Sequence, residues 1–371
     1  MSTVGILADD LTGALDAGVG FRGAFSPVDF LPDPSDAGRC GSVALNSGSR
    51  DMPGVDDAVR ATLDLMGLIS DKDIVFKKID SLLRGHAVAE IAAIMRHGGF
   101  ERCLLAPAFP DQGRVTKGGR QWLMAADGRA TPVGPDMSVA FAAAGIAAAV
   151  LSPDSERPPE RAAIWIGDAS TAAELAALAR RMAGRGRVLY CGTAGLARVL
   201  GGGVLRWPLP LPGPAVMVIG SPHPVTQRQV ARLLESAMPA AASADIVVSA
   251  ERGDLEAVGI AGGHCLLRPR LPTGITVPVA ARQVGALLAA HLPARSPVPT
   301  LMVAGGETLA QVVATIGARR LRMLGEIEPG VPVSRVVGGG WEGGLLVSKS
   351  GAFGDDDLLA RLFGLAASEA R

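Results

Sequence analysis

Cysteine is scarce in this chain, and the few cysteines lie far apart. The 371 residues include four cysteines, none in a C-x-x-C pair, namely Cys40, Cys103, Cys191 and Cys265. Disulfide frameworks and structural zinc sites need dense or closely spaced cysteines. The five histidines show no zinc-ligand spacing either. We therefore expect buried, reduced thiols, which is typical of a cytoplasmic protein.

Neither sign of charge is in excess, and aromatic residues are rare. Lys+Arg and Asp+Glu both number 36, and aromatics make up 4% of the chain. Nucleic-acid and membrane-surface proteins carry basic patches or stacking aromatics, so neither partner is expected. The longest apolar run, 139–151, is too short to span a bilayer, and we interpret it as a buried helix leading into a strand. Acidic residues at positions 9 and 10 argue against a secretory signal.

Common nucleotide and hydrolase signatures are also lacking. The chain has no G-x-x-x-x-G-K-[ST] and no G-x-S-x-G segment. Residues 18–23 and 338–343 match G-x-G-x-x-G, but the first lies inside a helical stretch and the second runs into a strand. A dinucleotide site needs a glycine turn between a strand and a helix N-terminus. Both matches are therefore rejected.

Short β-branched runs alternate with Ala- and Leu-rich helical stretches. Hydrophobic residues make up 48% of the chain and charged residues 19%, which is sufficient for a large core. The predicted strands are Val4–Leu7, Ser42–Leu45, Ile74–Ile79, Cys103–Ala106, Ile164–Ile166, Arg187–Tyr190, Ala215–Ile219, Asp245–Ser249, Leu301–Ala304 and Leu345–Ser348. This alternation is typical of βαβ units and predicts an α/β fold with mainly parallel sheets.

A proline-rich segment interrupts the alternation. Residues 207–214 read W-P-L-P-L-P-G-P, and four prolines in eight residues exclude a helix interior or a central strand. The chain length also favours two domains. We predict one domain over 1–208, a linker over 209–214 and a second domain over 215–371.

Charged residues follow three predicted strands of the first domain. Adjacent carboxylates can accept sugar hydroxyls or a proton, and arginine can bind a carboxylate through two hydrogen bonds. Open α/β sheets bind ligands at the carboxyl ends of their strands. The candidates are Asp9, Asp10, Arg50, Lys78, Asp80, Ser81 and Arg84. A pocket for a small polyhydroxy acid is expected, with helix capping and a solvated basic patch as alternatives.

A proline-bounded loop follows the fourth predicted strand. Residues 107–116 read P-A-F-P-D-Q-G-R-V-T, and the prolines and glycine fix its shape, from which Arg114 projects. A long ordered loop in a compact domain is often functional. Arg114 therefore joins the candidates.

Three loops containing glycine and serine or threonine follow strands of the second domain. They read G-S-P-H-P-V-T at 220–226, G-G-E-T at 305–308 and K-S-G-A-F-G at 349–354. Backbone amides and hydroxyls in such loops can hold phosphates without a Walker lysine. Glycine also marks ordinary turns, so nucleotide binding and plain turns both remain open from the residues alone.

Together these motifs resemble the four-carbon acid sugar kinase family along essentially the whole chain. The resemblance is carried by A-D-D-L-T-G-A at 8–14, K-I-D-S-L-L-R-G at 78–85, the 107–116 segment, G-T-A-G-L-A at 192–197 and the three loops above. It implies phosphorylation of the terminal hydroxyl of threonate, erythronate or an oxo-tetronate, with ATP and Mg²⁺ as cofactors. It also implies an N-terminal substrate domain, a C-terminal nucleotide domain and an active site in the cleft between them. A small-molecule sugar acid is the expected partner, and a homo-oligomer is compatible with the sequence.

The candidate residues divide into two sites. Asp10 and Asp80 are the candidates for orienting the attacking hydroxyl, and the acid-binding residues are Asp9, Arg50, Lys78, Ser81, Arg84 and Arg114. The nucleotide-binding residues are Ser221, His223, Gly305, Gly306, Glu307, Thr308 and Gly351. Leu82, His86, His223 and Ala352 depart from the family pattern, which leaves the preferred acid open. The alternatives are a non-catalytic sugar-acid sensor and, more distantly, a lyase that uses Lys78 as a Schiff base.

Overall fold

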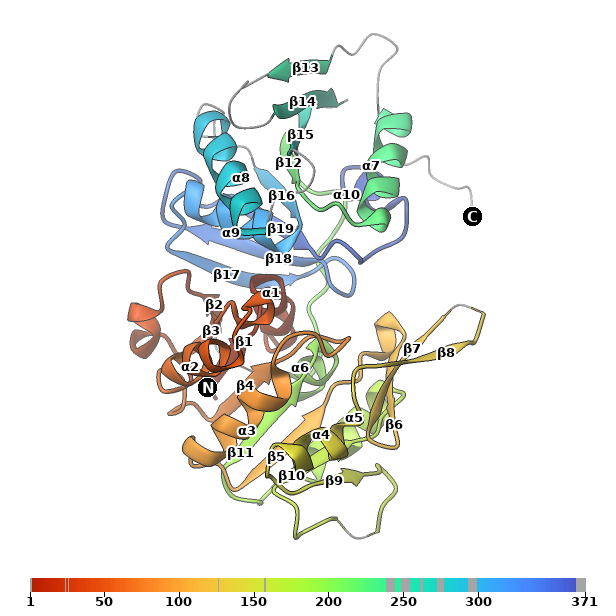
Figure 1. Cartoon of the computed structure of the whole chain (residues 1–371). Helices are drawn as coiled ribbons and strands as arrows, with labels where there is room; N and C mark the ends of the chain where they lie inside the picture. Colours follow the sequence, from red (N-terminus) through yellow and green to blue (C-terminus); the bar gives the residue numbers. More distant parts are fainter. Residues whose placement is uncertain are drawn as a thin grey trace. The chain divides into compact units, whose positions relative to one another are not determined.

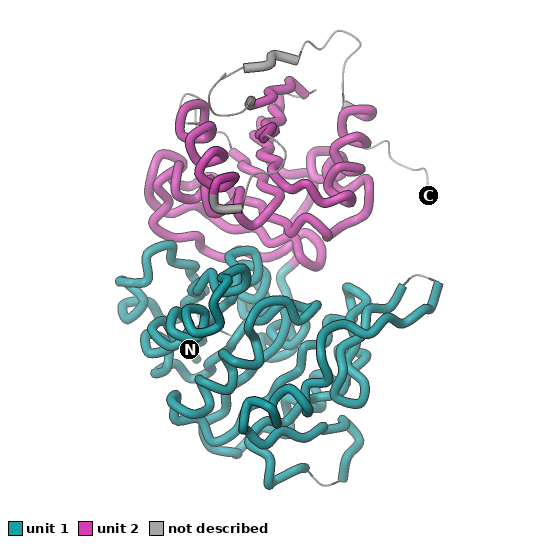
Figure 2. The backbone as a smooth tube through the Cα atoms, viewed as in Figure 1, with its two compact units in different colours: residues 1–205 teal, residues 206–371 magenta. Residues whose placement is uncertain are grey.

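The computed structural model describes residues 2–23, 25, 27–125, 127–156, 158–237, 244–247, 254–260, 263–271, 277–292 and 299–364. The chain divides into two compact units, residues 1–205 and 206–371 (Figure 2). Within the described ranges, no helix is long and apolar enough to cross a membrane.

Unit 1 contains a parallel sheet with helices packed against it (Figure 1). In spatial order its strands are β2 (Val28–Phe30), β3 (Ser42–Asn46), β1 (Val4–Ala8), β4 (Ile74–Lys78), β11 (Val188–Gly192), β5 (Arg102–Ala106), β10 (Ile164–Gly167) and β9 (Ala148–Leu151). The helices are α1 (Leu11–Gly20), α2 (Val55–Met66), α3 (Ala87–His97), α4 (Met137–Ala143), α5 (Ala172–Arg180) and α6 (Ala194–Leu200). Each pairing of neighbouring strands given for this sheet is parallel, as expected for short apolar strands buried on both faces.

The strand register aligns the carboxyl ends of the central strands. Ala8 pairs with Asn46 and with Lys78, Lys78 pairs with Gly192, and Gly192 pairs with Ala106. The loops that leave β3, β1, β4, β11 and β5 therefore begin side by side at one edge of the sheet. This edge is where ligands bind in open α/β sheets.

An antiparallel sheet of β6 (Arg114–Lys117), β7 (Arg120–Met124) and β8 (Ala130–Val133) lies where the sequence predicted a loop. The prediction is correct for the start of the 107–116 segment and wrong for its end, which forms β6. Gly118 and Gly119 join β6 to β7 with φ of 59° and 70°. Glycine adopts this left-handed region without steric cost, so a two-residue hairpin turn can form.

The apolar run at 139–151 is helix α4 followed by strand β9, as predicted, but its predicted burial is wrong. Val139 is 67% exposed and Val150 is 38% exposed, whereas Met137 and Phe141 are buried. Residues four positions apart share one face of a helix, so a single stripe of α4 faces the core. Strand β9 is the last strand in the sheet order, where one side has no neighbouring strand in this sheet.

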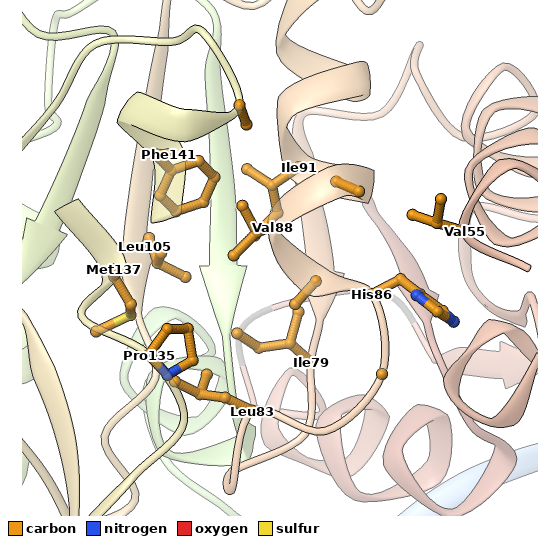
Figure 3. A pocket seen from close by; sticks show the side chains of 14 residues that line it. Val55, Ile79, Leu83, His86, Val88, Ile91, Leu105, Pro135, Met137 and Phe141 are labelled. Atoms are coloured by element: carbon orange, nitrogen blue, oxygen red, sulfur yellow. The ribbon is translucent and has the colours of Figure 1, made fainter. Parts of the chain in front are cut away.

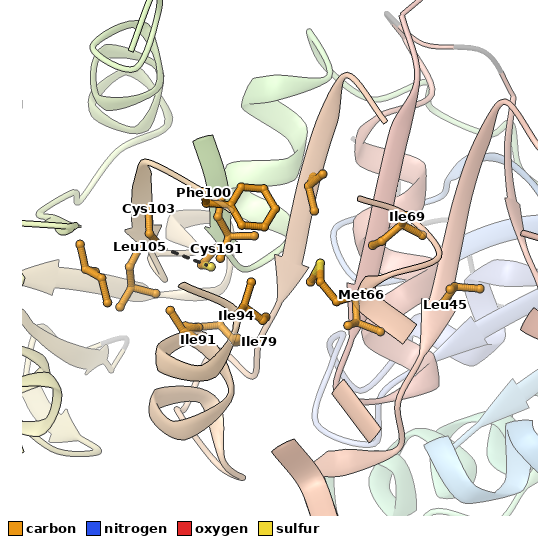
Figure 4. Close-up of a cluster of buried hydrophobic side chains, with 14 of the residues drawn as sticks. Leu45, Met66, Ile69, Ile79, Ile91, Ile94, Phe100, Cys103, Leu105 and Cys191 are labelled. Atoms are coloured by element: carbon orange, nitrogen blue, oxygen red, sulfur yellow. Dashed lines mark hydrogen bonds between the residues drawn. The ribbon is translucent and has the colours of Figure 1, made fainter. Parts of the chain in front are cut away.

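The core of unit 1 is a cluster of buried hydrophobic side chains, most of them aliphatic (Figure 4). Leu45, Ile69 and Ile91 are at most 1% exposed. All four cysteines are free thiols. Three of them are buried, as predicted, but Cys265 is only half-buried. Cys103 and Cys191 lie on the paired strands β5 and β11 with their sulfur atoms 3.5 Å apart, and burial raises the pKa of the Cys103 thiol.

Unit 2 contains a mixed sheet whose centre is parallel. In spatial order its strands are β13 (Ala244–Val247), β14 (Asp254–Ile260), β15 (His264–Arg270), β12 (Ala215–Ile219), β16 (Thr300–Ala304), β19 (Leu345–Lys349), β18 (Pro332–Val337) and β17 (Arg320–Glu326). β15, β12, β16 and β19 pair in parallel, and antiparallel strands flank them. The helices are α7 (Pro224–Ala237), α8 (Val277–His291), α9 (Gly306–Thr315) and α10 (Leu358–Leu362). The predicted α/β class with mainly parallel sheets is confirmed.

The proline-rich segment, 207–214, belongs to unit 2 and is hydrogen-bonded to other parts of it. Trp207 N donates to Glu326 O at 2.7 Å, and Leu211 N donates to Leu362 O at 2.9 Å. The carbonyl of Pro212 accepts a hydrogen bond from Thr300 Oγ1 at 2.7 Å. Because Leu211 is only 4% exposed, this part of the segment is anchored to the unit.

Candidate active site

Charged side chains from three loops meet at the aligned ends of β3, β1 and β4. Arg50 donates to both carboxylate oxygens of Asp9, from Nε at 3.1 Å and from Nη2 at 2.7 Å. Its Nη1 donates to Asp10 Oδ2 at 2.5 Å and lies 3.8 Å from Asp80 Oδ1. Arg50 therefore joins three carboxylates that follow two different strands.

Asp10 also caps helix α1. Its Oδ1 accepts from Gly13 N at 2.8 Å, and its Oδ2 accepts from Thr12 Oγ1 at 2.6 Å. The capping alternative is therefore correct for Asp10, and the cap fixes the orientation of its carboxylate. The Asp10 side chain is 19% exposed, against 4% for Asp9 and 7% for Asp80. Of these three carboxylates, Asp10 has the most contact with solvent.

Asp80 is held by the loop that follows it. Its Oδ2 accepts from Leu82 N at 3.1 Å and from Arg84 Nε at 2.9 Å, and its Oδ1 accepts from Arg84 Nη2 at 2.7 Å. Leu83 lies between them with φ of 58°, a left-handed conformation that is rare for leucine. Burial would raise the pKa of Asp80, but the hydrogen bonds from Arg84 and the charge of Arg50 outweigh it and hold this pKa well below its usual value.

Burial and the neighbouring charges have opposite effects on the pKa values of Asp9 and Arg50. Burial raises the pKa of Asp9, and the charge of Arg50 opposes this rise. Burial opposes ionisation of Arg50, but the charges of Asp10 and Asp9 outweigh it, so the pKa of Arg50 lies above its usual value. Lys78 is buried with its Nζ 2.9 Å from Ile79 O, and its positive charge lowers the pKa of Asp9 and of Asp80.

Gln121, on β7, ties the Asp80 loop to the 107–116 segment. Its Nε2 donates to Ser81 O at 3.1 Å and to Pro107 O at 3.0 Å. Arg114, from the same segment, lies close enough to Asp80 for the two charges to interact, while burial lowers the pKa of Arg114. Gln121 Oε1 accepts from Thr116 Oγ1 at 2.8 Å. Sequence reasoning gave Gln121 no role, because it lies outside every motif.

The G-T-A-G-L-A motif at 192–197, for which the sequence suggested no chemistry, contacts the 107–116 segment. Thr193 Oγ1 donates to Ala108 O at 2.8 Å. Arg198, just beyond the motif, lies 3.2 Å from Asp111 and 3.4 Å from Asp16 of α1, with its guanidinium carbon 4.7 Å from the centre of the Phe109 ring. Thr193 of the motif and the neighbouring Arg198 therefore hold the 107–116 segment in place.

Among the predicted acid-site residues, the arginines have different environments. The Arg50 side chain is 10% exposed and its guanidinium is held by Asp9 and Asp10, whereas the Arg84 side chain is 61% exposed. Arg84 is therefore better placed to meet a ligand carboxylate. Arg50 instead orders the aspartates.

An apolar pocket of about 290 Å³ adjoins the loop that carries Asp80 and Arg84 (Figure 3). Leu83, Met137 and Phe141 line it, together with His86, whose Nε2 lies 2.7 Å from Met52 O. Such a lining offers too few polar partners for the hydroxyls and carboxylate of a sugar acid. The polar cluster is therefore the candidate acid site.

In unit 2, the three predicted loops leave adjacent parallel strands. Ile219 of β12 pairs with Ala304 of β16, which pairs with Lys349 of β19. The amide of Ser221 donates to Ala304 O at 3.2 Å, and the amide of Gly305 donates to Lys349 O at 3.1 Å. The register and these hydrogen bonds bring the 220–226, 305–308 and 349–354 loops together.

Glycine is required where these loops approach one another. A Cβ atom on Gly351 would clash with Ser221 Oγ, and one on Gly220 would clash with Thr308 Oγ1. Gly305 has φ of 110°, and a Cβ atom there would lie 3.2 Å from Ser221 N. Bare backbone at the N-terminus of α9, which begins with Gly306 and Glu307, is suited to nucleotide phosphates.

The remaining polar groups order these loops. Ser221 Oγ accepts from His223 N, and His223 Nδ1 accepts from Val225 N, both at 3.3 Å, so the His223 ring is engaged at the start of α7. Mg²⁺ in phosphoryl-transfer sites is bound mainly by phosphates with one or two carboxylates. The residues that the structure describes contain no group of three or more His, Cys, Asp or Glu arranged to hold a metal.

Two buried residues of these loops were quoted within motifs but given no role. Thr226 is fully buried, Lys349 is 1% exposed, and Lys349 Nζ donates to Thr226 Oγ1 at 2.9 Å. The signal in the sequence was a lysine at the end of an apolar strand, directly before a glycine-containing loop.

Two family models match the chain: a sugar-binding N-terminal domain over residues 4–200 and a nucleotide-binding C-terminal domain over residues 271–359. A D-threonate kinase of Cupriavidus necator is 30% identical, with 95% of both chains covered. A D-threonate kinase of Bordetella bronchiseptica is 29% identical, with 96% of both covered. A 3-oxo-tetronate kinase of Pseudomonas fluorescens is 29% identical, with 97% of this chain and 96% of the relative covered.

Two crystal structures share the fold at 20% sequence identity. One is a protein of Salmonella typhimurium LT2, with a TM-score of 0.71 and all of both chains covered. The other is a Haemophilus influenzae protein, with a TM-score of 0.67, covering 97% of this chain and 99% of that one.

Proposed function

The chain belongs to the four-carbon acid sugar kinase family, and we propose that it transfers the γ-phosphoryl group of ATP to the terminal hydroxyl of a four-carbon sugar acid. The observation that carries this proposal is the meeting of Asp9, Asp10 and Asp80 with Arg50 and Arg84 at one sheet edge. Relatives that span nearly the whole chain are named D-threonate and 3-oxo-tetronate kinases. Threonate, erythronate and the oxo-tetronates are the proposed substrates.

Arg84 binds the substrate carboxylate in this proposal. A guanidinium has five N–H donors, and Asp80 accepts from Nε and Nη2 of Arg84, so donors remain for a ligand. Arg114 adds positive charge near the Asp80 carboxylate, and Ser81 follows Asp80 directly in the chain. The positive charge of the buried Lys78 lowers the pKa of Asp80 further and opposes the rise that burial causes in the pKa of Asp9.

Asp10 orients the attacking hydroxyl in this proposal. Its carboxylate is the most exposed of the three, and the helix cap and Arg50 keep it in place before substrate arrives. Phosphoryl transfer depends more on alignment and charge stabilisation than on a strong base. Asp80, whose pKa is held low by Arg84 and Arg50, instead positions Arg84.

The loops of unit 2 bind the nucleotide in this proposal. ATP would supply the phosphoryl group, and Mg²⁺ would neutralise the charge that develops during its transfer. Ser221, Gly305, Gly306, Thr308 and Gly351 offer backbone amides and hydroxyls to the phosphates, Glu307 adds a carboxylate at the start of α9, and His223 orders the first loop.

The direct test is ADP formation from Mg·ATP with a panel of acids. The panel holds D- and L-threonate, D- and L-erythronate and the oxo-tetronates, with larger aldonates as controls. We expect turnover with a four-carbon acid and none with the larger ones. Folded protein that forms no ADP with any four-carbon acid would contradict the proposal. Binding of an acid without turnover would favour the sensor.

A further inference from the structure

Lys349 is a buried base that the proposed chemistry does not use. It ends strand β19, where the four residues before it are buried, and it is itself 1% exposed. Burying an ammonium group is costly unless strong partners compensate, and an apolar side chain of similar size usually packs there at lower cost. A lysine at this position therefore needs an explanation beyond packing.

The hydrogen bonds of Thr226 fix the role of Lys349. Thr226 Oγ1 lies 2.8 Å from Gly351 O, and a carbonyl can only accept, so the hydroxyl proton is used there. The oxygen lone pairs then remain for Lys349 Nζ, which donates at 2.9 Å. The contacts form a directed chain from Lys349 through Thr226 to Gly351.

The hydrogen bonds of Lys349 link all three loops of the candidate nucleotide site. Thr226 lies in the first turn of α7, after the 220–223 turn, and Gly351 lies in the 349–354 loop. The carbonyl of Lys349 accepts from the amide of Gly305, at the start of the 305–308 loop. The side chain and the backbone of one residue thus connect segments that follow β12, β16 and β19.

The charge of Lys349 is poised to respond to pH. Burial lowers its pKa to about 8, and the charge of Glu328 opposes this change. Glu328 is itself paired with Arg361 at 3.0 Å, and His223 lies beside Gly351 in the same group of loops. An ammonium in such a site would be stabilised by the anionic phosphates of a bound nucleotide, which gives a reason to retain it.

We propose that Lys349 is a positioning residue of the nucleotide site, which fixes the 349–354 loop against α7 through Thr226 and places a buried positive charge behind the phosphate-binding loops. This inference rests on the proposed assignment of these loops to the nucleotide. No contact between Lys349 and the nucleotide is required.

The test is calorimetric binding of Mg·ADP to the full chain at pH 7. Lys349→Met removes both the charge and the hydrogen-bond donor, whereas Lys349→Arg keeps the charge. Thr226→Val removes the hydroxyl that bonds to Lys349 and Gly351, and Thr226→Ser retains it. Arg335→Met is the matched control, because it removes one positive charge from an exposed position on β18 whose Nη1 contacts Gly343 O. Binding of the acid substrate and thermal unfolding are measured for each variant.

We expect Lys349→Met to weaken Mg·ADP binding by about tenfold or more, as is typical when a charged hydrogen-bonding group is lost. Thr226→Val should weaken it less, while Thr226→Ser and Arg335→Met should stay within about twofold of the parent chain. Because a buried charge is removed, the unfolding temperature of Lys349→Met should not fall. Raising the pH from 7 to 9 should weaken binding by the parent chain but not by Lys349→Arg, whose charge persists.

Two results would overturn the inference. One is Mg·ADP binding by Lys349→Met within about twofold of the parent chain. The other is a joint loss of stability, acid binding and nucleotide binding, which would make Lys349 a residue of folding alone. If the parent chain binds Mg·ADP but phosphorylates no acid, the proposed function fails, while the affinity ratio still decides the role of Lys349. A parent chain that binds no Mg·ADP overturns both.

Discussion

Arg50 explains why two aspartates stand together after the first strand. Asp10 caps α1, which needs a single carboxylate, while Asp9 is 3% exposed and held through both oxygens by Arg50. Removing Arg50 would leave a buried carboxylate without its partner, which is more damaging than loss of a surface ion pair. In the proposed mechanism, Asp9 and Arg50 therefore support the site, and Asp10 faces the substrate.

Replacing Asp10 and Asp80 separately tests this division of roles. We expect Asp10→Asn to lower kcat by about 10²-fold or more, the range typical of a general acid–base or orienting group. Asp80→Asn should mainly raise KM for the acid, because Arg84 loses the partner that positions it. Steady-state kinetics with the acid found in the panel provide the measurement. If both variants keep nearly normal kcat, neither residue orients the hydroxyl.

Lys349 should also affect how the free energy of unfolding depends on pH. Its folded pKa of about 8 lies below the ordinary 10.5, so between these values the unfolded chain binds more protons. This group therefore makes the free energy of unfolding rise with pH across that window, and its full penalty, at most about 3 kcal/mol, applies below pH 8.

We accordingly expect the stability advantage of Lys349→Met over the parent chain to be largest at pH 7 and to shrink towards pH 10. Urea unfolding at pH 7, 8.5 and 10 measures this difference, with Arg335→Met as the control whose offset should stay constant. An advantage of Lys349→Met that does not change with pH would mean that the lysine titrates normally in the folded chain.

At the scale of helices and strands, the sequence predicted that the charged residues after β1, β3 and β4 meet at one sheet edge, because these strands are short and mostly apolar. All three strands are almost wholly buried, and their apolar residues made them recognisable, although β4 ends in two buried lysines and stops at Lys78, one residue before its predicted end. The β6–β7 hairpin was missed although Gly118 and Gly119 provide a two-residue turn, because the prolines of the preceding segment favoured a loop.

Contacts between side chains and segments far away in the sequence could not be predicted from the sequence. Arg198 contacts Asp16, which lies 182 positions earlier, and Gln121 contacts the carbonyl of Ser81, 40 positions earlier. No local pattern encodes such pairs, since they exist only once the strands are aligned. The same holds for Lys349 and Thr226, separated by 123 positions.

The close approach of the 349–354 loop to the 220–226 loop can be tested with a single methyl group. Gly351→Ala would place a Cβ atom against Ser221 Oγ, so one loop must move, and we expect Mg·ADP binding to weaken by about tenfold or more. Gly259→Ala is the matched control, because a Cβ atom there meets no atom within 4 Å. Equal Mg·ADP affinities in the two variants would show that the loops do not form the site.

At the scale of the whole chain, each unit has a hydrophobic core of its own. One cluster of buried residues lies within unit 1 and another within unit 2. The sugar-binding family model, 4–200, lies within unit 1, and the nucleotide-binding model, 271–359, lies within unit 2. The assignment of the acid to one unit and of ATP to the other, and the active site between the two domains, stay predictions.

Crossing two variants with two ligands tests that assignment. Asp10→Asn alters the acid cluster of unit 1, and Gly351→Ala alters the loops of unit 2. If each unit binds its own ligand, Asp10→Asn should weaken binding of the acid while Mg·ADP affinity stays within about twofold, and Gly351→Ala should do the reverse. Calorimetry measures the four affinities, and unchanged unfolding temperatures confirm that both variants are folded. Folded Gly351→Ala that loses the acid but keeps Mg·ADP would reverse the assignment, because a methyl group beside Ser221 can act on the acid only if the acid binds in unit 2 or depends on its loops.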